Sequence, residues 1–276
     1  MSEKQQFSVL MSVYIKENPI FLKDAIKSIQ NQTMKPSEII LVEDGPLTSE
    51  LYQVLDQIEA ESEIPVKRCP LEENQGLGLA LRYGVLQCQY DIIARMDTDD
   101  IAVPDRFEQQ IHLMEQENLD LLGGHIAEFI DNPKEVVSYR RVPTQHADIV
   151  AYQRMRSAFN HMTVMFKKNM VLKAGNYEDG LYMEDDLLWL NMIAAGARTG
   201  NVDQILCRVR VGAGMFERRG GLRYLNLYRQ ARQRMLERNQ ISYIEYAKSV
   251  GVQAVVALCP GFVRQFIFVK LLRKSK

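Results

Sequence analysis

The sequence predicts an α/β protein in which a mostly parallel central sheet is flanked by helices. Three observations support this fold class. Short apolar runs alternate with segments of helical periodicity, no linker rich in Gly, Pro or Ser separates the two halves, and polar residues follow directly after the apolar runs. A chain of 276 residues, 46% of them hydrophobic, can bury the core that such a sheet needs.

The first half of the chain reads as repeated strand and helix units. Phe7 to Val13 is a short apolar run, and Pro19 to Thr33 then places apolar residues at helical spacing. The alternation continues as strand, helix, strand, helix and strand over the ranges 38–42, 49–58, 66–69, 77–87 and 92–96. Ligands of parallel sheets gather at the carboxyl ends of the strands, so the residues after each strand are the candidates for a site.

The second half is less regular. It predicts one or two strands in 119–130, a strand at 163–166, a helix at 183–195 and a strand at 205–211. We interpret this region as completing the same sheet, because nothing in its composition marks a domain boundary.

Composition excludes several classes of protein. A net charge of −1 provides no broad basic face for a phosphate backbone, so we expect no nucleic-acid partner. The four cysteines lie far apart without a CxxC pair, which argues against a disulfide framework or a zinc site and favours a reducing compartment. The polar N-terminus has no signal-peptide segment, and no stretch reaches the roughly 20 apolar residues of a spanning helix. We therefore expect a cytoplasmic protein without a transmembrane helix.

The loops after the first two strands contain no glycine-rich phosphate loop. Neither GxGxxG nor GxxxxGK[ST] occurs there, and Gly76 to Gly78 gives only GxG, so a dinucleotide-binding dehydrogenase is not favoured. After the second strand, the carboxylate of Asp44 could accept hydrogen bonds from a base or a ribose hydroxyl. The same residues also fit an ordinary Asp-Gly turn.

Two acidic groups occupy positions where carboxylates could carry chemistry. Asp97, Asp99 and Asp100 follow the strand at 92–96, and such a cluster raises its own pKa values unless a cation or hydrogen-bond donors lie nearby. A hard divalent ion would remove that cost and could bridge a diphosphate, although Asp100 could instead cap the helix that Pro104 opens. The second group opens the helix at 183–195, where its carboxylates either stabilise the helix dipole or supply a general base.

Four motifs and one acidic pair follow one another in an order that resembles family 2 glycosyltransferases with the GT-A fold. They are FSVLMSVY, IILVEDG, ENQGLGLALRYG, ARMDTDDIAVPDRFEQQ and the pair Glu184 and Asp185. The resemblance runs from Phe7 to about Arg273 and is closest to small bacterial enzymes that build O-antigen, capsule or exopolysaccharide units. It implies inverting transfer of a hexose or N-acetylhexosamine from a nucleotide diphosphate sugar, expected to be a UDP-sugar, to a saccharide acceptor linked to polyprenyl diphosphate.

The resemblance also implies roles for individual residues. Asp99 and Asp97 would form the DxD pair that holds Mn²⁺ or Mg²⁺, and Asp185, with Glu184 beside it, would be the catalytic base. His161 would face the active site. Contacts to the nucleotide sugar are implied for Val13, Tyr14, Glu17, Asp44, Asn74, Gly76, Arg82 and Asp97, and for Arg218 and Arg219 in a segment that closes over the diphosphate.

The sequence departs from the family pattern at two places. The base motif reads Glu184, Asp185, Asp186, Leu187 where relatives often carry acidic, Asp, aromatic, Asp, so the choice among the three carboxylates stays open. Glu43 and Pro46 replace the usual Asp and Ser around Asp44. Two rival functions also stay open at this point, a non-catalytic sugar-nucleotide-binding scaffold and another nucleotide-using transferase.

The C-terminal segment has its own pattern. We expect a catalytic domain over 1–240, with a nucleotide-binding half at 1–100 and an acceptor-side half at 101–240, followed by a helical tail at 241–276. From Val252 to Leu272 this tail interleaves apolar residues with Arg and Lys, which suits a helix lying on an anionic membrane surface. The alternative is a C-terminal helix packed on the domain. The pattern favours a peripheral protein on the inner face of the cell membrane.

Overall fold

Strands and helices alternate along the first hundred residues as predicted. The computed structural model describes residues 5–179, 183–212 and 220–259. Elements of this first part begin and end within a few residues of the predicted bounds: β1 Phe7–Val13, α1 Pro19–Gln30, β2 Glu38–Glu43, α2 Ser49–Glu61, β3 Val66–Pro70, α3 Leu77–Gln87 and β4 Ile92–Arg95.

The second part contains more elements than its sequence pattern predicts. The predicted helix at 183–195 is α7, and the strand expected at 205–211 begins earlier, at Thr199. Helices α5 and α6 and strand β7 were not predicted. The bounds are β5 Ile101–Ala102, α4 Arg106–Glu117, β6 Leu121–Phe129, β7 Val136–Arg140, α5 His146–Gln153, β8 Met165–Lys167, α6 Lys168–Lys173, α7 Glu184–Ala194 and β9 Thr199–Arg210.

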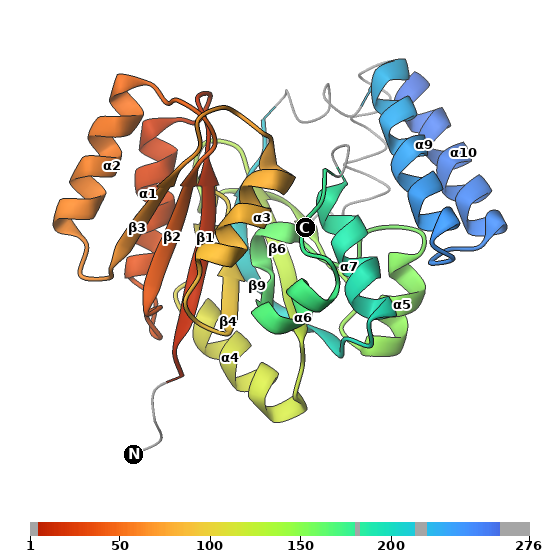
Figure 1. The fold of residues 1–276 in the computed structure, drawn as a ribbon, viewed down its shortest axis with the longest axis horizontal. Coiled ribbons are helices and arrows are strands. Elements are labelled where there is room, and N and C mark those ends of the chain that lie inside the picture. The colour runs from red at the N-terminus through yellow and green to blue at the C-terminus, as the bar shows by residue number, and fades with distance from the viewer. Residues whose placement is uncertain (1–4, 180–182, 213–219, 260–276) are drawn as a thin grey trace.

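One sheet contains all these strands, in the order β3-β2-β1-β4-β8-β6-β9-β5, with β7 paired to β6 (Figure 1). Strands β3, β2, β1 and β4 are parallel, as expected for crossover helices. Beyond β4 the sheet is mixed, because β8 is antiparallel to β4 and β6, whereas β6 and β9 are parallel. The expectation of a mostly parallel sheet therefore holds for the first half, and the second half adds antiparallel pairs.

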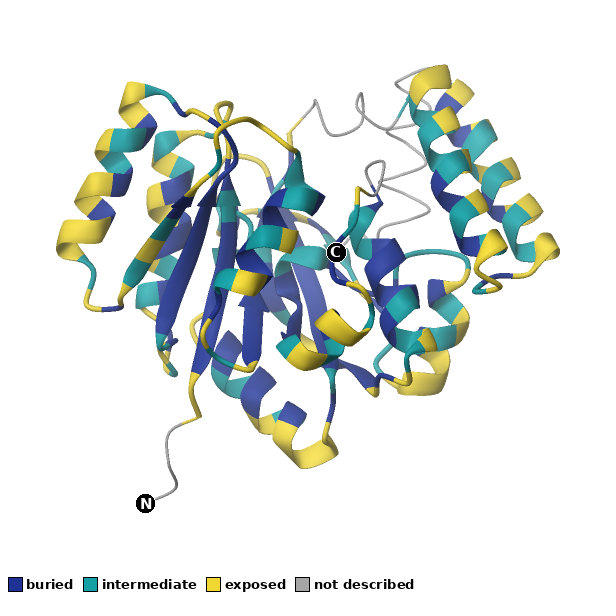
Figure 2. Ribbon diagram, in the orientation of Figure 1, coloured by how far each residue is buried: buried dark blue, intermediate teal, exposed yellow. Residues whose placement is uncertain are grey.

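Helices cover both faces of the sheet and form three layers. Side chains alternate along each strand, so Val9 and Met11 of β1 join the cluster beneath α1, α2 and α4, whereas Leu10 joins the cluster beneath α3 and α7. Helix α1 begins where the Asn18 side chain accepts a hydrogen bond from the amide of Ile20. Figure 2 shows that the central strands are buried along most of their length, while the outer helices expose one side.

The last two described helices, α9 Gly221–Glu237 and α10 Tyr243–Leu258, pack against each other beside α7 (Figure 1). Leu187 and Leu190 of α7 share a buried cluster with Ala231 and Met235 of α9. Ser242 and Glu245 form a capping box that begins α10. The predicted boundary at residue 240 thus falls at the turn of a helical pair, and the division into a domain and a tail stays a prediction. None of the helices in the described part of the chain is long and apolar enough to cross a membrane.

Candidate active site

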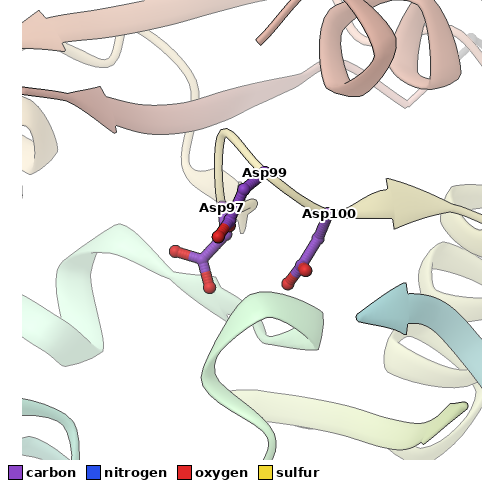
Figure 3. Close-up of side chains that lie close together, drawn as sticks. All are labelled: Asp97, Asp99 and Asp100. Carbon is purple, nitrogen blue, oxygen red and sulfur yellow. The ribbon is translucent and has the colours of Figure 1, made fainter. Parts of the chain in front are cut away.

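The acidic cluster lies on the loop between β4 and β5. Carboxylate oxygens of Asp97, Asp99 and Asp100 lie within 4.8 Å of one another, and Figure 3 shows the three side chains on the same side of the loop. Burial, and next the charge of Asp97, raise the pKa of Asp99 to about 7. Burial also raises the pKa of Asp100, whose Oδ2 atom is buried without a hydrogen-bond partner among the described residues. An all-oxygen cluster with an unpaired buried acceptor fits a hard divalent cation.

Strand β9 holds the far side of this loop. The amide of Arg210 donates to Oδ1 of Asp100 at 2.9 Å, and its Nε donates to the carbonyl oxygen of Asp99 at 3.4 Å. The guanidinium lies over the ring of Phe21 at 3.7 Å and that of Phe129 at 4.7 Å. Asp100 is therefore engaged by the protein, as the capping alternative implied, but its partner is a strand amide and not the helix that follows.

The loop after β1 reaches the same cluster through Glu17. The hydroxyl of Thr98 donates to Oε2 of Glu17 at 2.5 Å, and Oε1 of Glu17 accepts from the amide of Asn18 at 2.7 Å. Glu17 thus orders the acidic loop from the β1 side. Tyr14 is 38% exposed, whereas the Val13 side chain is fully buried in the core, so only its backbone is available to a ligand.

The carboxylate of Asp44 organises the loop that precedes α3. Its Oδ1 accepts from the amide of Gln75 at 2.7 Å, and its Oδ2 accepts from the amide of Gly76 at 3.1 Å and from the side chain of Asn74 at 3.0 Å. A Cβ on Gly45, whose φ is +84°, would lie 2.6 Å from the amide nitrogen of Asn74. Asp44, Asn74 and Gly76, three of the predicted contacts to the nucleotide sugar, therefore form one hydrogen-bonded unit.

Arg82 lies further along α3, in a surface groove that it shares with Lys173 and Arg238. Its Nη1 donates to the carbonyl of Tyr177 at 3.0 Å, and its own carbonyl accepts from the Asn176 side chain. Arg82 thus ties α3 to the turn after α6. The other two predicted arginines, Arg218 and Arg219, lie outside the described residues.

The three carboxylates at the start of α7 have different surroundings. Asp186 is buried, and its Oδ1 accepts from the side-chain amide of Gln153 at 2.7 Å. Burial raises the pKa of Asp185 well above its usual range, and the charges of Asp186 and Glu184 add to the effect. Glu184 packs on the first turn of α3, because a Cβ on Gly78 would lie 2.9 Å from the Cβ of Glu184. The hydrogen bond of Asp186 leaves Asp185 and Glu184 as the candidates for a base.

A cluster of aromatic side chains lies between the two acidic groups. Nε2 of His161 and the Tyr177 hydroxyl are 2.9 Å apart, and both rings pack against Trp189. Burial, together with the charge of Arg95, lowers the pKa of His161, so its ring is neutral at pH 7. Burial raises the pKa of Tyr177, and charges of Arg95, Asp185, Glu184 and Asp97 all act on it. The charges of the acidic cluster and of the start of α7 therefore both act on Tyr177.

Sequence reasoning missed several residues of this site. Arg95, Arg210 and Gln153 hold Asp97, Asp100 and Asp186 respectively. The one signal in the sequence was Arg95, a charged residue at the end of the otherwise apolar strand Ile92–Arg95. Arg210 lies 110 residues from Asp100, and Gln153 lies 33 residues from Asp186. No local sequence pattern can reveal partners this far apart.

Comparison with known proteins agrees with this geometry. The model of glycosyl transferase family 2 matches residues 8–180. The chain is 38% identical over 265 residues to the amylovoran biosynthesis glycosyltransferase AmsE of Erwinia amylovora, covering 96% of this chain and 98% of that protein. It is 36% identical over 270 residues to the UDP-Gal:alpha-D-GlcNAc-diphosphoundecaprenol beta-1,3-galactosyltransferase of Escherichia coli, covering 98% and 97%.

Solved structures share the fold at low identity. The mannosyltransferase PcManGT from Pyrobaculum calidifontis, solved in complex with GDP-Man and Mn²⁺, superposes with a TM-score of 0.61 at 13% identity, covering 95% of this chain and 79% of that one. The mixed sheet with helices on both faces is thus a GT-A fold. The family model covers more than half of the chain, and the two relatives align along nearly all of it. This chain therefore belongs to glycosyl transferase family 2 and is a glycosyltransferase.

Proposed function

We propose that this glycosyltransferase moves a hexose or N-acetylhexosamine, with inversion, from a UDP-sugar to a lipid-linked saccharide during cell-surface polysaccharide assembly. The observation that carries the proposal is the clustered carboxylates at 97–100, together with the Glu184 and Asp185 pair, whose charges act on the same Tyr177 as the charge of Asp97. A transferase of this type must neutralise a departing diphosphate and deprotonate an acceptor hydroxyl. The two acidic groups supply one site for each task. The E. coli relative named for UDP-Gal and for a diphosphoundecaprenol-linked GlcNAc supports the donor and acceptor classes.

Asp99 and Asp97 would hold a divalent ion, for which the all-oxygen cluster is suited and for which manganese has a precedent in PcManGT. When bound, such an ion supplies Lewis-acid stabilisation of the leaving group. The unit of Asp44, Asn74 and Gly76 would border the nucleotide, with Glu17 and Tyr14 on the β1 side. Arg218 and Arg219 are proposed as phosphate partners on chemical grounds alone, since guanidinium groups bind phosphate in a bidentate manner.

Asp185 is the proposed base. It would take the proton of the acceptor hydroxyl as that oxygen attacks the anomeric carbon, from the side opposite the diphosphate. Burial makes its carboxylate a stronger base than a solvated one, because the same desolvation that raises its pKa favours the protonated product. Glu184 precedes Asp185 at the start of α7 and packs against the first turn of α3, where it would help to shape the acceptor side.

The exposed face of α10 supports a peripheral position on the inner membrane leaflet. Ile244, Val252, Val255 and Leu258 are 64%, 65%, 63% and 59% exposed and lie on one side of the helix, opposite the buried Val256 and Ala257. The sequence beyond residue 259 continues with apolar residues and with Arg264, Lys270, Arg273 and Lys274. An apolar helix face followed by cations suits an interface with anionic lipid, where the proposed acceptor would reside.

The experiment is an assay of UDP release with a panel of nucleotide sugars and a synthetic GlcNAc-diphosphate lipid, in manganese and in EDTA. We expect one UDP-sugar to be turned over only with the divalent ion, and Asp99→Ala to bind UDP equally weakly in both. Hydrolysis or transfer at the same rate in EDTA would contradict the metal role. Turnover of GDP-sugars alone would contradict the proposed donor class.

A further inference from the structure

We propose that Arg95 is a positioning residue of this site, whose buried guanidinium fixes the carboxylate of Asp97 and thereby sets how the acidic cluster meets a metal-bound nucleotide diphosphate. The inference rests on the proposed function, and it concerns a residue that would contact neither the metal ion nor the nucleotide. Arg95 ends β4, two residues before Asp97. Its Nη2 lies 2.5 Å from Oδ1 of Asp97, and the exposed fractions of the two side chains are 2% and 28%. The ion pair thus joins the protein interior to the ligand side of the site.

The backbone of Arg95 is held on both sides, which makes its side chain a fixed anchor. Its amide donates to the carbonyl of Val164 at 2.8 Å, and its carbonyl accepts from Nη2 of Arg106 at 2.7 Å. Arg106 is itself fully buried and also donates to Gln110. Hydrogen bonds fix the backbone of Arg95, and the ion pair with Asp97 fixes its guanidinium. Arg95 can therefore hold the Asp97 carboxylate in one orientation.

The remaining N–H groups of Arg95 are enclosed by the protein. Its Nε and Nη1 atoms are shielded from solvent and lack a hydrogen-bond partner among the described residues. A buried donor without a partner lowers stability, so core packing alone does not account for an arginine at this position. The ion pair with Asp97 connects the buried charge of Arg95 to the exposed side of the acidic cluster.

Arg95 is also placed between the two acidic groups. Asp97 and Asp100 act on it from its own loop, and Tyr177 acts on it from the turn after α6. Burial raises the pKa of Glu184 at the start of α7, and the positive charge of Arg95 opposes that rise. Neutral His161 faces it from the segment before β8. One buried cation is therefore shared by the proposed metal side and the proposed acceptor side.

The test is a double-mutant cycle read out as binding, without an acceptor. Binding of UDP with Mn²⁺ is measured by calorimetry, and bound Mn²⁺ by its EPR signal, for the parent, Arg95→Met, Arg95→Lys, Asp97→Asn and Arg95→Met/Asp97→Asn. We expect Arg95→Met to weaken Mn²⁺–UDP binding by about 10- to 100-fold, the usual cost of removing a group that orients a ligand residue. The lysine variant should recover part of the loss. In the Asp97→Asn background, removing Arg95 should change binding less than twofold, because the oriented carboxylate is already gone and the two residues are coupled.

Arg232→Met is the matched control, since Arg232 is also fully buried and its guanidinium donates to the Ser249 hydroxyl and the Arg154 carbonyl, which do not belong to the acidic cluster. It should lower the melting temperature and leave Mn²⁺–UDP affinity near the parental value. Additive effects of Arg95→Met and Asp97→Asn, or parental affinity in Arg95→Met, would overturn the proposal. If Arg95→Met does not fold, the Lys variant and its double mutant with Asp97→Asn complete the cycle. A parent that binds Mn²⁺–UDP but transfers no sugar contradicts the proposed function alone, whereas a parent that binds no Mn²⁺–UDP contradicts both.

Discussion

The side-chain amide of Gln153 donates a hydrogen bond of 2.7 Å to the buried carboxylate of Asp186, and its carbonyl accepts from the amide of Ala158. Gln153 ends α5, so this pair joins α5 to the first turn of α7. Asp186 is therefore a connector between helices. Its neighbour Asp185, which the same turn presents in a different direction, is left for chemistry.

Asp185→Asn should separate binding from turnover. The amide keeps the size of the side chain but cannot accept a proton, so we expect turnover to fall by at least about 10²-fold while UDP affinity stays within a few-fold. Asp186→Asn is the matched control, because its amide oxygen can still accept from Gln153, and it should keep most activity. Both are measured as steady-state turnover and as UDP binding. Parental turnover in Asp185→Asn together with an inactive Glu184→Gln would move the base to Glu184.

Asp44→Ala should loosen the loop before α3. Removing the carboxylate leaves the amides of Gln75 and Gly76 without their acceptor, so both should exchange hydrogen faster, and UDP affinity should fall with them. Hydrogen-exchange mass spectrometry of the peptide covering 71–80 measures the first effect. Asp24→Ala, an exposed carboxylate on α1, is the control. Unchanged exchange with lost UDP affinity would instead indicate that Asp44 acts only on the nucleotide.

Gly78→Ala should disturb the contact between α3 and α7. The added Cβ would lie 2.6 Å from the carbonyl oxygen of Glu178 and 2.9 Å from the Cβ of Glu184. Because a backbone atom cannot move aside cheaply, we expect a loss of about 1–3 kcal/mol in the free energy of unfolding, with reduced turnover. Gly251→Ala, on α10 with open space around it, should be neutral or stabilising by about 0.5–1 kcal/mol. Thermal unfolding of both variants checks this; equal stability would contradict it.

Arg238→Met should remove a pH-dependent tie between α9 and the segment before α7. Nη1 and Nη2 of Arg238 lie 2.6 and 2.9 Å from the two carboxylate oxygens of Glu178, and these hydrogen bonds lower the pKa of Glu178 below 4.5. A lowered folded-state pKa contributes stability that is complete above pH 4.5 and is lost as the pH falls through the folded value. The melting temperature of the variant should therefore lie below the parental one at pH 7, with the difference shrinking as the pH falls below 4.5.

Arg229→Met is the control for that series, since Nη2 of Arg229 on α9 donates to the side-chain oxygen of Asn226, a group that does not titrate. Its effect on the melting temperature should not vary with pH. A difference between Arg238→Met and the parent that stays constant across the titration would contradict the role of Glu178.

Val252→Ser/Val255→Ser should weaken association with vesicles that contain anionic lipid. Both side chains are more than 60% exposed on α10, so the fold should be retained while apolar contact with the bilayer is lost. Co-sedimentation with phosphatidylglycerol vesicles is the measurement. Leu86→Ser, which removes an exposed apolar side chain from α3, is the control. Equal co-sedimentation of the double variant and the parent would remove α10 from the membrane role.

The sequence pattern predicts the parallel half of the fold well because each of its elements is long or strongly periodic. Strand β1 is apolar except for two serines, helix α1 repeats apolar residues at helical spacing, and the bounds of both were predicted to within a few residues. Helix α5 was missed because it is short, its apolar residues do not recur at helical spacing, and only Ile149 and Gln153 are buried. The first residues of β9 are polar and are strand only because β6 pairs with them, which no local pattern reveals.

In the candidate site, too, the sequence predicted some residues and missed others. Placement after β2 and β4 predicted Asp44 and the 97–100 cluster, because the topology of a parallel sheet determines where strand ends lie. The partners of these residues come from distant segments, as with Gln75 for Asp44 and Arg210 for Asp100. Which carboxylate is bonded to the protein therefore depends on tertiary structure, and the sequence favoured Asp185 among the residues at 184–186 only through its match to the family motif.

The bond between Arg210 and Asp100 has a consequence for how the enzyme is made. Asp100 belongs to the first half of the chain, yet its carboxylate is held by the last strand, 110 residues later. During synthesis, the parallel strands β1 to β4 can pair as soon as they leave the ribosome, since their partners are close in the chain. Strand β9 must emerge and pair with β5 and β6 before the acidic loop is held in place. The growing polypeptide thus carries the parallel half of the sheet early and completes the acidic loop only after most of the protein has been translated.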